Sequence, residues 1–119
     1  MKTLIVGASD KPDRYSYKAM KILEQFGHEV VLVHPSLKTI ADHPVIPNIA
    51  SVKDTIDTVT LYINPALSDA LEQDLLQLAP RRVIFNPGTE NPRLVKALRN
   101  SGIATEDACT LVLLQTHQF

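Results

Sequence analysis

A short apolar segment at the start of the chain, 3–6, runs directly into Gly7-Ala8-Ser9. Such a segment predicts a buried strand, and the amphipathic pattern that begins after a polar gap predicts a helix. A strand that leads through a loop into a helix N-terminus is a natural anion site, because unpaired N–H groups and the helix dipole attract phosphate. Gly7 and Ala8 would let a ligand approach the backbone closely. The chain therefore predicts a phosphate-binding loop after its first strand.

Further strands and helices alternate along the rest of the chain. After the first strand, further strands are expected at 30–33, from Ile56 or Thr58 to Ile63, at 82–85 and, weakly, at 103–105, with a short edge strand at Val45-Ile46. Ser16 is the expected N-cap of the first helix and Gly27 its C-terminal stop. Later helices are expected from Asn64-Pro65 to Pro80, from Asn91-Pro92 to Gly102, and from a cap at Asp107 to Leu114.

This alternation predicts a fold in which helices cover both faces of a mainly parallel sheet. We expect one Rossmann-like, doubly wound α/β domain over residues 1–119, with a sheet of about five strands. Ligands of such sheets bind at the carboxyl ends of the strands, near the topological switch point. Those ends carry small, polar or proline-rich sequences that would meet at one edge: Gly7-Ala8-Ser9, His34-Pro35-Ser36, Asn64-Pro65 and Asn86-Pro87-Gly88.

Charge and composition exclude several classes of partner. The net charge is −1 and the pI is about 6.4, far from the basic character of a nucleic-acid-binding domain. No apolar run approaches the roughly 18 residues that a membrane span requires. The one cysteine excludes an internal disulfide, and the N-terminus lacks a secretion signal. We expect a cytoplasmic protein without nucleic-acid or membrane partners, and a homodimer stays open.

Two common nucleotide-binding motifs are missing from the loop. A dinucleotide fingerprint that starts at Gly7 would need glycines where Ser9 and Pro12 stand. The second strand ends in His34-Pro35 instead of the acidic residue that holds a ribose. No Gly-Lys-Ser/Thr sequence is present, which excludes a P-loop. NAD is therefore not the expected ligand.

The order of motifs resembles the small CoA-binding domain family, whose fold also forms the N-terminal domain of the succinyl-CoA synthetase α subunit. The matching stretches span nearly the whole chain: 6–9, 12–17, 27–30, 33–35, 43–49, 56–59 and 106–110. Two positions depart from the family pattern, because His34 replaces its usual asparagine and Tyr15 replaces its frequent proline. CoA ligases of the wider group carry a phosphohistidine on a second domain, for which 119 residues leave no room.

The resemblance implies a domain that binds CoA or an acyl-CoA and performs no chemistry alone. It implies that Gly7, Ala8 and Ser9 offer donors to the pyrophosphate, and that Arg14 and Lys38 supply positive charge. His34-Pro35 and Asn64-Pro65 would line the adenine and ribose pocket. Ser16 and Tyr17 complete the predicted site at the start of the first helix.

Plainer interpretations of these residues stay open. Ser9 could satisfy only its own turn, Arg14 and Lys18 could be solvated charges, and Tyr17 could face the core. No histidine spacing indicates a metal site. One alternative is a small enzyme that uses Cys109 or His34 on an acyl thioester. Another is an interaction protein with a vestigial pocket, whose exposed Phe119 and Leu111–Leu114 run would bind a partner.

Overall fold

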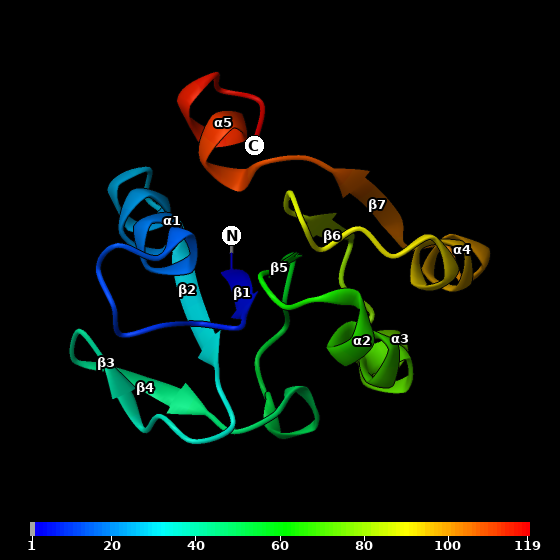
Figure 1. Ribbon diagram of the computed structural model, residues 1–119, viewed down its shortest axis with the longest axis horizontal. Helices are drawn as coiled ribbons and strands as arrows, with labels where there is room; N and C mark the ends of the chain where they lie inside the picture. The colour runs from blue at the N-terminus through cyan, green and yellow to red at the C-terminus, as the bar shows by residue number, and fades with distance from the viewer. Residues whose placement is uncertain (1) are drawn as a thin grey trace.

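Residues 2–119, which the computed structural model describes, form an α/β domain around one seven-stranded sheet (Figure 1). The strand order is β3-β4-β2-β1-β5-β6-β7. The centre and one side of the sheet consist of parallel strands: β1 (Lys2–Val6), β2 (Glu29–Val33), β5 (Thr58–Leu61), β6 (Arg82–Phe85) and β7 (Ala104–Asp107). From β1 the chain moves outward on one side to β2 and returns to the other side through β5, so β1 marks the switch point of the sheet.

The two additional strands lie where the sequence is least regular. β4 (His43–Ile46) pairs parallel to β2, and β3 (Thr39–Ile40) pairs antiparallel to β4 at the edge. Ala41 and Asp42 connect them with φ angles of 47° and 67°, as a two-residue hairpin with positive φ at both positions requires. The expected strand at Val45-Ile46 is thus confirmed but longer, and β3 rather than β4 forms the edge. The sheet therefore has more strands than the expected five.

Helices cover both faces of the sheet, which confirms the doubly wound arrangement (Figure 1). α1 (Tyr15–Gln25) and α5 (Thr110–Gln115) lie on one face, where Met20, Leu23 and Leu114 are buried against Ile5 and Leu32. The other face carries α2 (Pro65–Ser68), α3 (Glu72–Leu78) and α4 (Pro92–Asn100). Its core includes Leu75, Leu94 and Leu98 together with apolar side chains of the central strands. No helix within residues 2–119 is long and apolar enough to cross a membrane.

Two helix starts differ from the expected ones. The N-cap of α1 is Arg14, whose extended backbone precedes the helix, and Ser16 is a buried first-turn residue rather than the cap. Cys109 rather than Asp107 precedes α5, because Asp107 still pairs with Phe85 in the sheet and extends β7 beyond the expected end.

The long helix expected between residues 64 and 80 is interrupted. A 3-10 turn, Asp69–Leu71, separates α2 from α3. The Asp69 carboxylate accepts hydrogen bonds from Asn91 Nδ2 (2.8 Å) and Arg93 Nε (3.1 Å), which tie this turn to the start of α4. Leu67, expected in the apolar stripe, is 58% exposed. The expected cap Asn64 is confirmed, since its side chain accepts from the Leu67 N–H at 3.0 Å.

The end of the described chain packs on the domain instead of presenting an apolar surface. Leu113 and Leu114 are buried, and only Val112 of the 111–114 run is strongly exposed. The Phe119 ring lies 4.6 Å from the Arg82 guanidinium carbon, and its carbonyl accepts a hydrogen bond from Arg82 Nη2 at 3.2 Å. The interaction-protein alternative assumed that Phe119 and the 111–114 run are exposed, and this prediction is therefore wrong.

One buried polar network joins β5, β6 and α5. Asn86, which is 2% exposed, donates from Nδ2 to Thr60 Oγ1 (2.6 Å) and to the Leu61 carbonyl (2.8 Å). Its Oδ1 accepts from the Thr110 N–H at 2.9 Å, and the Thr60 and Thr110 hydroxyls lie 2.8 Å apart. Asn86 thereby fixes where α5 begins relative to the strand ends.

At the opposite end of the sheet, the ion pair between Arg81 and Asp57 should make the stability of the fold depend on pH in the acidic range. Arg81 donates from Nε (3.1 Å) and Nη2 (3.2 Å) to the Asp57 carboxylate, which also accepts from Thr58 Oγ1 at 2.6 Å. The Arg81 hydrogen bonds, followed by that of Thr58, hold the pKa of Asp57 below its usual value. A carboxyl with a lowered folded-state pKa stabilises the fold above its unfolded pKa of about 3.9, and this contribution is lost as pH falls through the folded value.

We therefore expect Asp57→Asn to lower the free energy of unfolding by only about 0.5–1 kcal/mol at pH 7, because the Arg81 side chain is 59% exposed and solvent screens the pair. The difference from wild type should shrink toward zero as pH falls below about 4. Urea unfolding of both proteins between about pH 7 and pH 3 measures this difference in stability. Asp13→Asn, which makes the same change at an exposed residue, is the control. Parallel pH profiles for wild type and Asp57→Asn would contradict the prediction.

Candidate functional site

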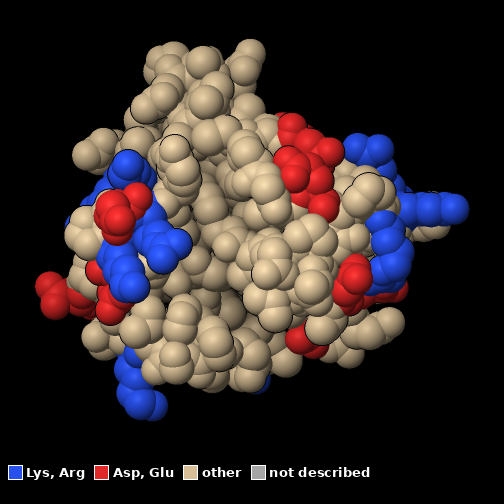
Figure 2. Space-filling view, viewed as in Figure 1, with Lys and Arg blue, Asp and Glu red and all other residues tan. Residues whose placement is uncertain are grey.

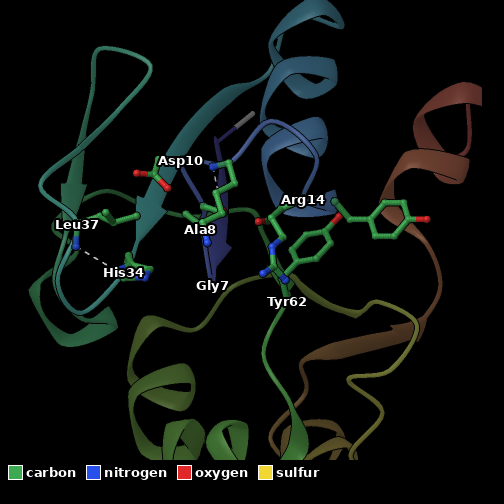
Figure 3. A pocket seen from close by; sticks show the side chains of 11 residues that line it. Gly7, Ala8, Asp10, Arg14, His34, Leu37 and Tyr62 are labelled. Carbon is green, nitrogen blue, oxygen red and sulfur yellow. Dashed lines mark hydrogen bonds between the residues drawn. The ribbon is translucent and has the colours of Figure 1, made fainter.

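A cavity of about 440 Å³ opens at the switch point of the sheet (Figure 3). Its wall combines the ends of three neighbouring strands: Gly7 to Ser9 after β1, His34 after β2 and Tyr62 after β5. The first turn of α1 closes another side through Tyr15 and Ser16. A cleft at the carboxyl ends of the strands, where the strand order reverses, is the usual ligand site of a doubly wound sheet.

Gly7 permits the close packing of this loop. Its φ is +87°, and a Cβ there would lie 2.8 Å from Ile63 Cγ2 and 2.9 Å from the Tyr62 carbonyl oxygen. A larger residue would therefore combine a strained backbone with a clash against the loop after β5. Gly7 allows β1 and β5 to end side by side at the base of the cavity.

The backbone donors that face the cavity follow the glycine. The N–H groups of Gly7 and Ala8 both donate to the Val33 carbonyl at 3.3 Å, so these two groups are engaged within the sheet. Within residues 2–119, the N–H groups of Ser9 and Asp10 make no hydrogen bond. The first N–H groups of α1 also lack intrahelical partners, as at any helix start, and no side chain caps them. Unpaired donors thus converge from the loop and from the helix N-terminus.

Ser9 and its neighbours hold the loop in shape. Ser9 Oγ accepts the Lys11 N–H at 3.1 Å, and the Lys11 carbonyl accepts the Arg14 N–H at 3.0 Å. These short-range bonds form a turn of the kind that serine hydroxyls favour. Oγ keeps its own proton to donate, so Ser9 both closes the turn and offers a donor at the cavity wall.

Positive charge outweighs negative charge around the cavity. Lys11 and Arg14 line it together with Asp10. Within residues 2–119 the Arg14 side chain forms no ion pair and no hydrogen bond, and Figure 3 shows it extending beside Tyr62. Figure 2 shows Lys and Arg gathered toward the two sides of the face in view, with few charges over its centre. A free guanidinium beside unpaired N–H groups is suited to an anion.

His34 has a structural role at the cavity edge. Its Nδ1 accepts hydrogen bonds from the N–H groups of Ser36 (3.1 Å) and Leu37 (3.0 Å; dashed in Figure 3). These bonds assign the proton of the neutral ring to Nε2, which is then a donor. His34 thus shapes the turn after β2 as an asparagine side chain would, and it leaves one ring N–H for a ligand.

The structure brings together about half of the residues predicted for the site. The predicted residues that line the cavity are Gly7, Ala8, Ser9, Arg14, Ser16 and His34. Those that do not line it are Tyr17, Pro35, Lys38, Asn64 and Pro65. Tyr17 packs against the core beneath α1. Pro35 is exposed within the turn after β2, Lys38 is exposed beyond it, and Asn64-Pro65 begin α2.

Sequence reasoning missed several lining residues: Asp10, Lys11, Tyr15, Leu37 and Tyr62. Tyr62 follows β5 directly, and its position at a strand end was a usable signal. Burial raises the pKa of Tyr62 to about 12, so the phenol is neutral at physiological pH. No group of three potential metal ligands occurs among residues 2–119.

Comparison with known proteins agrees with the fold. A family model described as CoA binding domain matches residues 1–115. The crystal structure of an uncharacterized protein is 42% identical, with a TM-score of 0.93 over 99% of this chain and 97% of that one. The uncharacterized protein YneT of Bacillus subtilis (strain 168) is 21% identical over 98 residues, which are 82% of this chain and 73% of YneT.

A fold likeness also extends to a much larger protein. The dinucleotide forming acetyl-coenzyme A synthetase 1 of Ca. Korarchaeum cryptofilum, solved with phosphate and ADP, has a TM-score of 0.77 at 16% identity. The match covers 90% of this chain and 25% of that protein. At this identity the likeness shows that the two share a fold.

Proposed function

The chain belongs to the CoA binding domain family, and we propose that its cavity binds the diphosphate of CoA or an acyl-CoA without catalysing a reaction. One observation carries the proposal: Ser9 and Asp10, whose N–H groups make no hydrogen bond within residues 2–119, line the same cavity as Arg14, whose side chain has no ion pair there. Backbone donors at a helix start together with a free guanidinium are a favourable environment for phosphate oxygens. We place this activity in the cytoplasm, for which the single free cysteine is the supporting feature.

The arrangement of reactive side chains supports binding over catalysis. His34 lines the larger cavity, whereas Cys109 lines a separate, smaller one. Within residues 2–119 no hydrogen bond joins the two side chains, and the His34 Nδ1 accepts from the Ser36 and Leu37 N–H groups, so His34 is not placed as the base of a Cys109 nucleophile. Incubating the protein with acetyl-CoA and measuring free thiol tests this: turnover that disappears in Cys109→Ala would establish the enzyme alternative.

The ligand class is tested by thermal unfolding with CoA and with NAD. At one hundred times Kd a ligand stabilises the fold by about 2.7 kcal/mol, which is readily measured. We expect such a shift with CoA and a smaller one with NAD, because the second and third glycines of the dinucleotide motif and the acidic ribose ligand are missing. A clear shift with NAD and none with CoA would overturn the proposal.

The charge at position 14 provides a second test. Arg14→Ala should weaken CoA binding by about tenfold or more, because a charge-assisted hydrogen bond contributes roughly 1.5–3 kcal/mol. Stability without ligand should change little, since the guanidinium contacts no charged partner within residues 2–119. Calorimetry measures both affinities. Lys18→Ala removes the same charge from a residue of α1 that does not line the cavity, and equal losses in the two variants would contradict a direct role for Arg14.

A further inference from the structure

A second, smaller cavity lies next to the candidate phosphate site. Its volume is about 220 Å³, and it is lined by Tyr15, Tyr62, Asn86, Pro87 and Cys109. Tyr15 and Tyr62 also line the larger cavity, so the two spaces adjoin along these tyrosines. The smaller space lies beyond β5, on the side of the sheet away from His34.

The two cavities differ in chemical character. The larger one carries Lys11 and Arg14, whereas none of the five residues lining the smaller one bears a formal charge at neutral pH. Two tyrosine rings and a proline ring form most of the smaller wall. The amide of Asn86 is occupied by Thr60, Leu61 and Thr110, so it has no free donor for a ligand. One ligand that filled both spaces would be charged at one end and weakly polar at the other.

We propose that this smaller cavity receives the thioester end of a short-chain acyl-CoA, which makes the protein a receptor for acylated CoA rather than free CoA. The inference rests on the proposed function, because it requires the diphosphate to lie at the Ser9 loop. Its volume of about 220 Å³ is below the roughly 300 Å³ at which pockets for whole drug-sized ligands begin. It therefore suits a short acyl group and not a long chain.

The order of the strands matches the order of the parts of such a ligand. The ends of β2, β1, β5 and β6 follow one another, carrying His34, the Ser9 loop, Tyr62 and Asn86 in turn. Three strand spacings separate the first from the last, which is about 14 Å. A nucleotide on the His34 side and a diphosphate at the Ser9 loop would direct the remaining arm across Tyr62 toward Cys109, with the arm bent because it is longer than the strand spacings that it crosses.

The Tyr62 hydroxyl is a second, independent feature of this region. Its oxygen is buried, which raises its pKa, and it forms no hydrogen bond of ordinary geometry within residues 2–119, although the Thr110 and Thr60 hydroxyls lie near enough to lower that pKa in part. An unsatisfied buried hydroxyl is unfavourable by about 1–3 kcal/mol. Because burial keeps it protonated, with a pKa of about 12, it can act as a donor at neutral pH. A thioester carbonyl that entered the cavity would offer the acceptor that this hydroxyl lacks.

The test compares three ligands by calorimetry on the whole protein: 3′-phospho-ADP, CoA and acetyl-CoA. We expect 3′-phospho-ADP to bind, and acetyl-CoA to bind more tightly than CoA. Cys109→Phe, which places a ring in the smaller cavity, should weaken acetyl-CoA by about tenfold or more through overpacking and leave 3′-phospho-ADP unchanged. Acetyl-CoA binding that is equal in wild type and Cys109→Phe would overturn the inference.

A labelling experiment on the unmutated protein covers the case in which Cys109→Phe does not fold. Cys109 is the single cysteine, so iodoacetamide reports on this cavity alone. At one hundred times Kd, acetyl-CoA should slow alkylation on the order of tenfold or more, whereas 3′-phospho-ADP should not. Binding of 3′-phospho-ADP with no protection by acetyl-CoA overturns the inference alone. Failure of 3′-phospho-ADP to bind at all overturns the proposed function beneath it.

Discussion

Asn86→Leu is expected to lower the free energy of unfolding by about 3 kcal/mol or more. Asn86 is 2% exposed and holds β5, β6 and α5 together through three hydrogen bonds of 2.6–2.9 Å. Leucine has a similar size but leaves the Thr110 N–H buried without an acceptor and removes a donor from Thr60 and Leu61. Each buried group left unsatisfied is unfavourable by about 1–3 kcal/mol, which is more than the added apolar surface recovers. Urea unfolding followed by circular dichroism measures the loss.

Asn64→Ala is the matched control, because Asn64 also stands before a proline at the end of a strand. Asn64 is exposed and accepts one hydrogen bond, from the Leu67 N–H. Its loss should lower the free energy of unfolding by about 1 kcal/mol, the usual effect of removing a helix N-cap. Equal, small losses for the two variants would mean that the Asn86 network does not hold α5 to the sheet.

The contrast between these two asparagines shows how far sequence reasoning reaches. Asn64-Pro65 and Asn86-Pro87 are indistinguishable as strand-ending pairs, and both were predicted to lie at the binding edge. The first caps α2 outside the cavity, while the second is a buried cross-link beside the smaller one. Local sequence predicts where a strand ends, but the partners of a side chain come from distant segments such as Thr60 and Thr110.

The shape of the loop after β1 was predictable because it depends on consecutive residues. The apolar run that ends at Gly7 determines, within three or four consecutive residues, where β1 ends, that the backbone there has a positive φ, and that the loop after β5 can pack closely against it. The prediction of one uninterrupted helix at 64–80 was wrong because this segment depends on residues distant in the sequence. Its leucine spacing fits one helix, but hydrogen bonds from Asn91 and Arg93 to Asp69 stabilise a 3-10 turn in the middle. Tertiary contacts override local periodicity at such a position.

The donors of the loop also differ from their predicted positions. Glycine and alanine after a strand were expected to offer their N–H groups to phosphate, but both donate to Val33 across the sheet. The open donors begin one residue later, at Ser9. Which N–H groups stay open depends on how the ends of β1 and β2 align, and this alignment could not be predicted from the sequence.

Ser9→Glu is expected to reduce CoA affinity by about 100-fold or more while the fold persists. Ser9 lines the cavity directly after the strand and Gly7, and it is held by the sheet and by the turn to Lys11. A carboxylate there would lie within a few ångströms of any phosphate bound to the open N–H groups. Two unit charges 4 Å apart repel by about 4 kcal/mol at the effective dielectric near a protein surface, which solvent and nearby cations reduce. Calorimetry with CoA measures the loss, and circular dichroism verifies the fold.

Two controls separate charge at the site from other effects of the substitution. Ser9→Ala removes only a neutral hydrogen bond of about 0.5–1.5 kcal/mol, so its affinity should fall between twofold and roughly tenfold. Gln25→Glu makes the same change in net charge at the far end of α1, about 15 Å along the helix from its first residue, and should leave CoA binding close to that of wild type. Repulsion from a distant charge is largely screened over that distance at physiological salt, whereas repulsion within the loop is not. A folded Ser9→Glu that binds CoA as wild type does would mean that the phosphates bind elsewhere, and the free donors of Ser9 and Asp10 would then have to be satisfied by water alone.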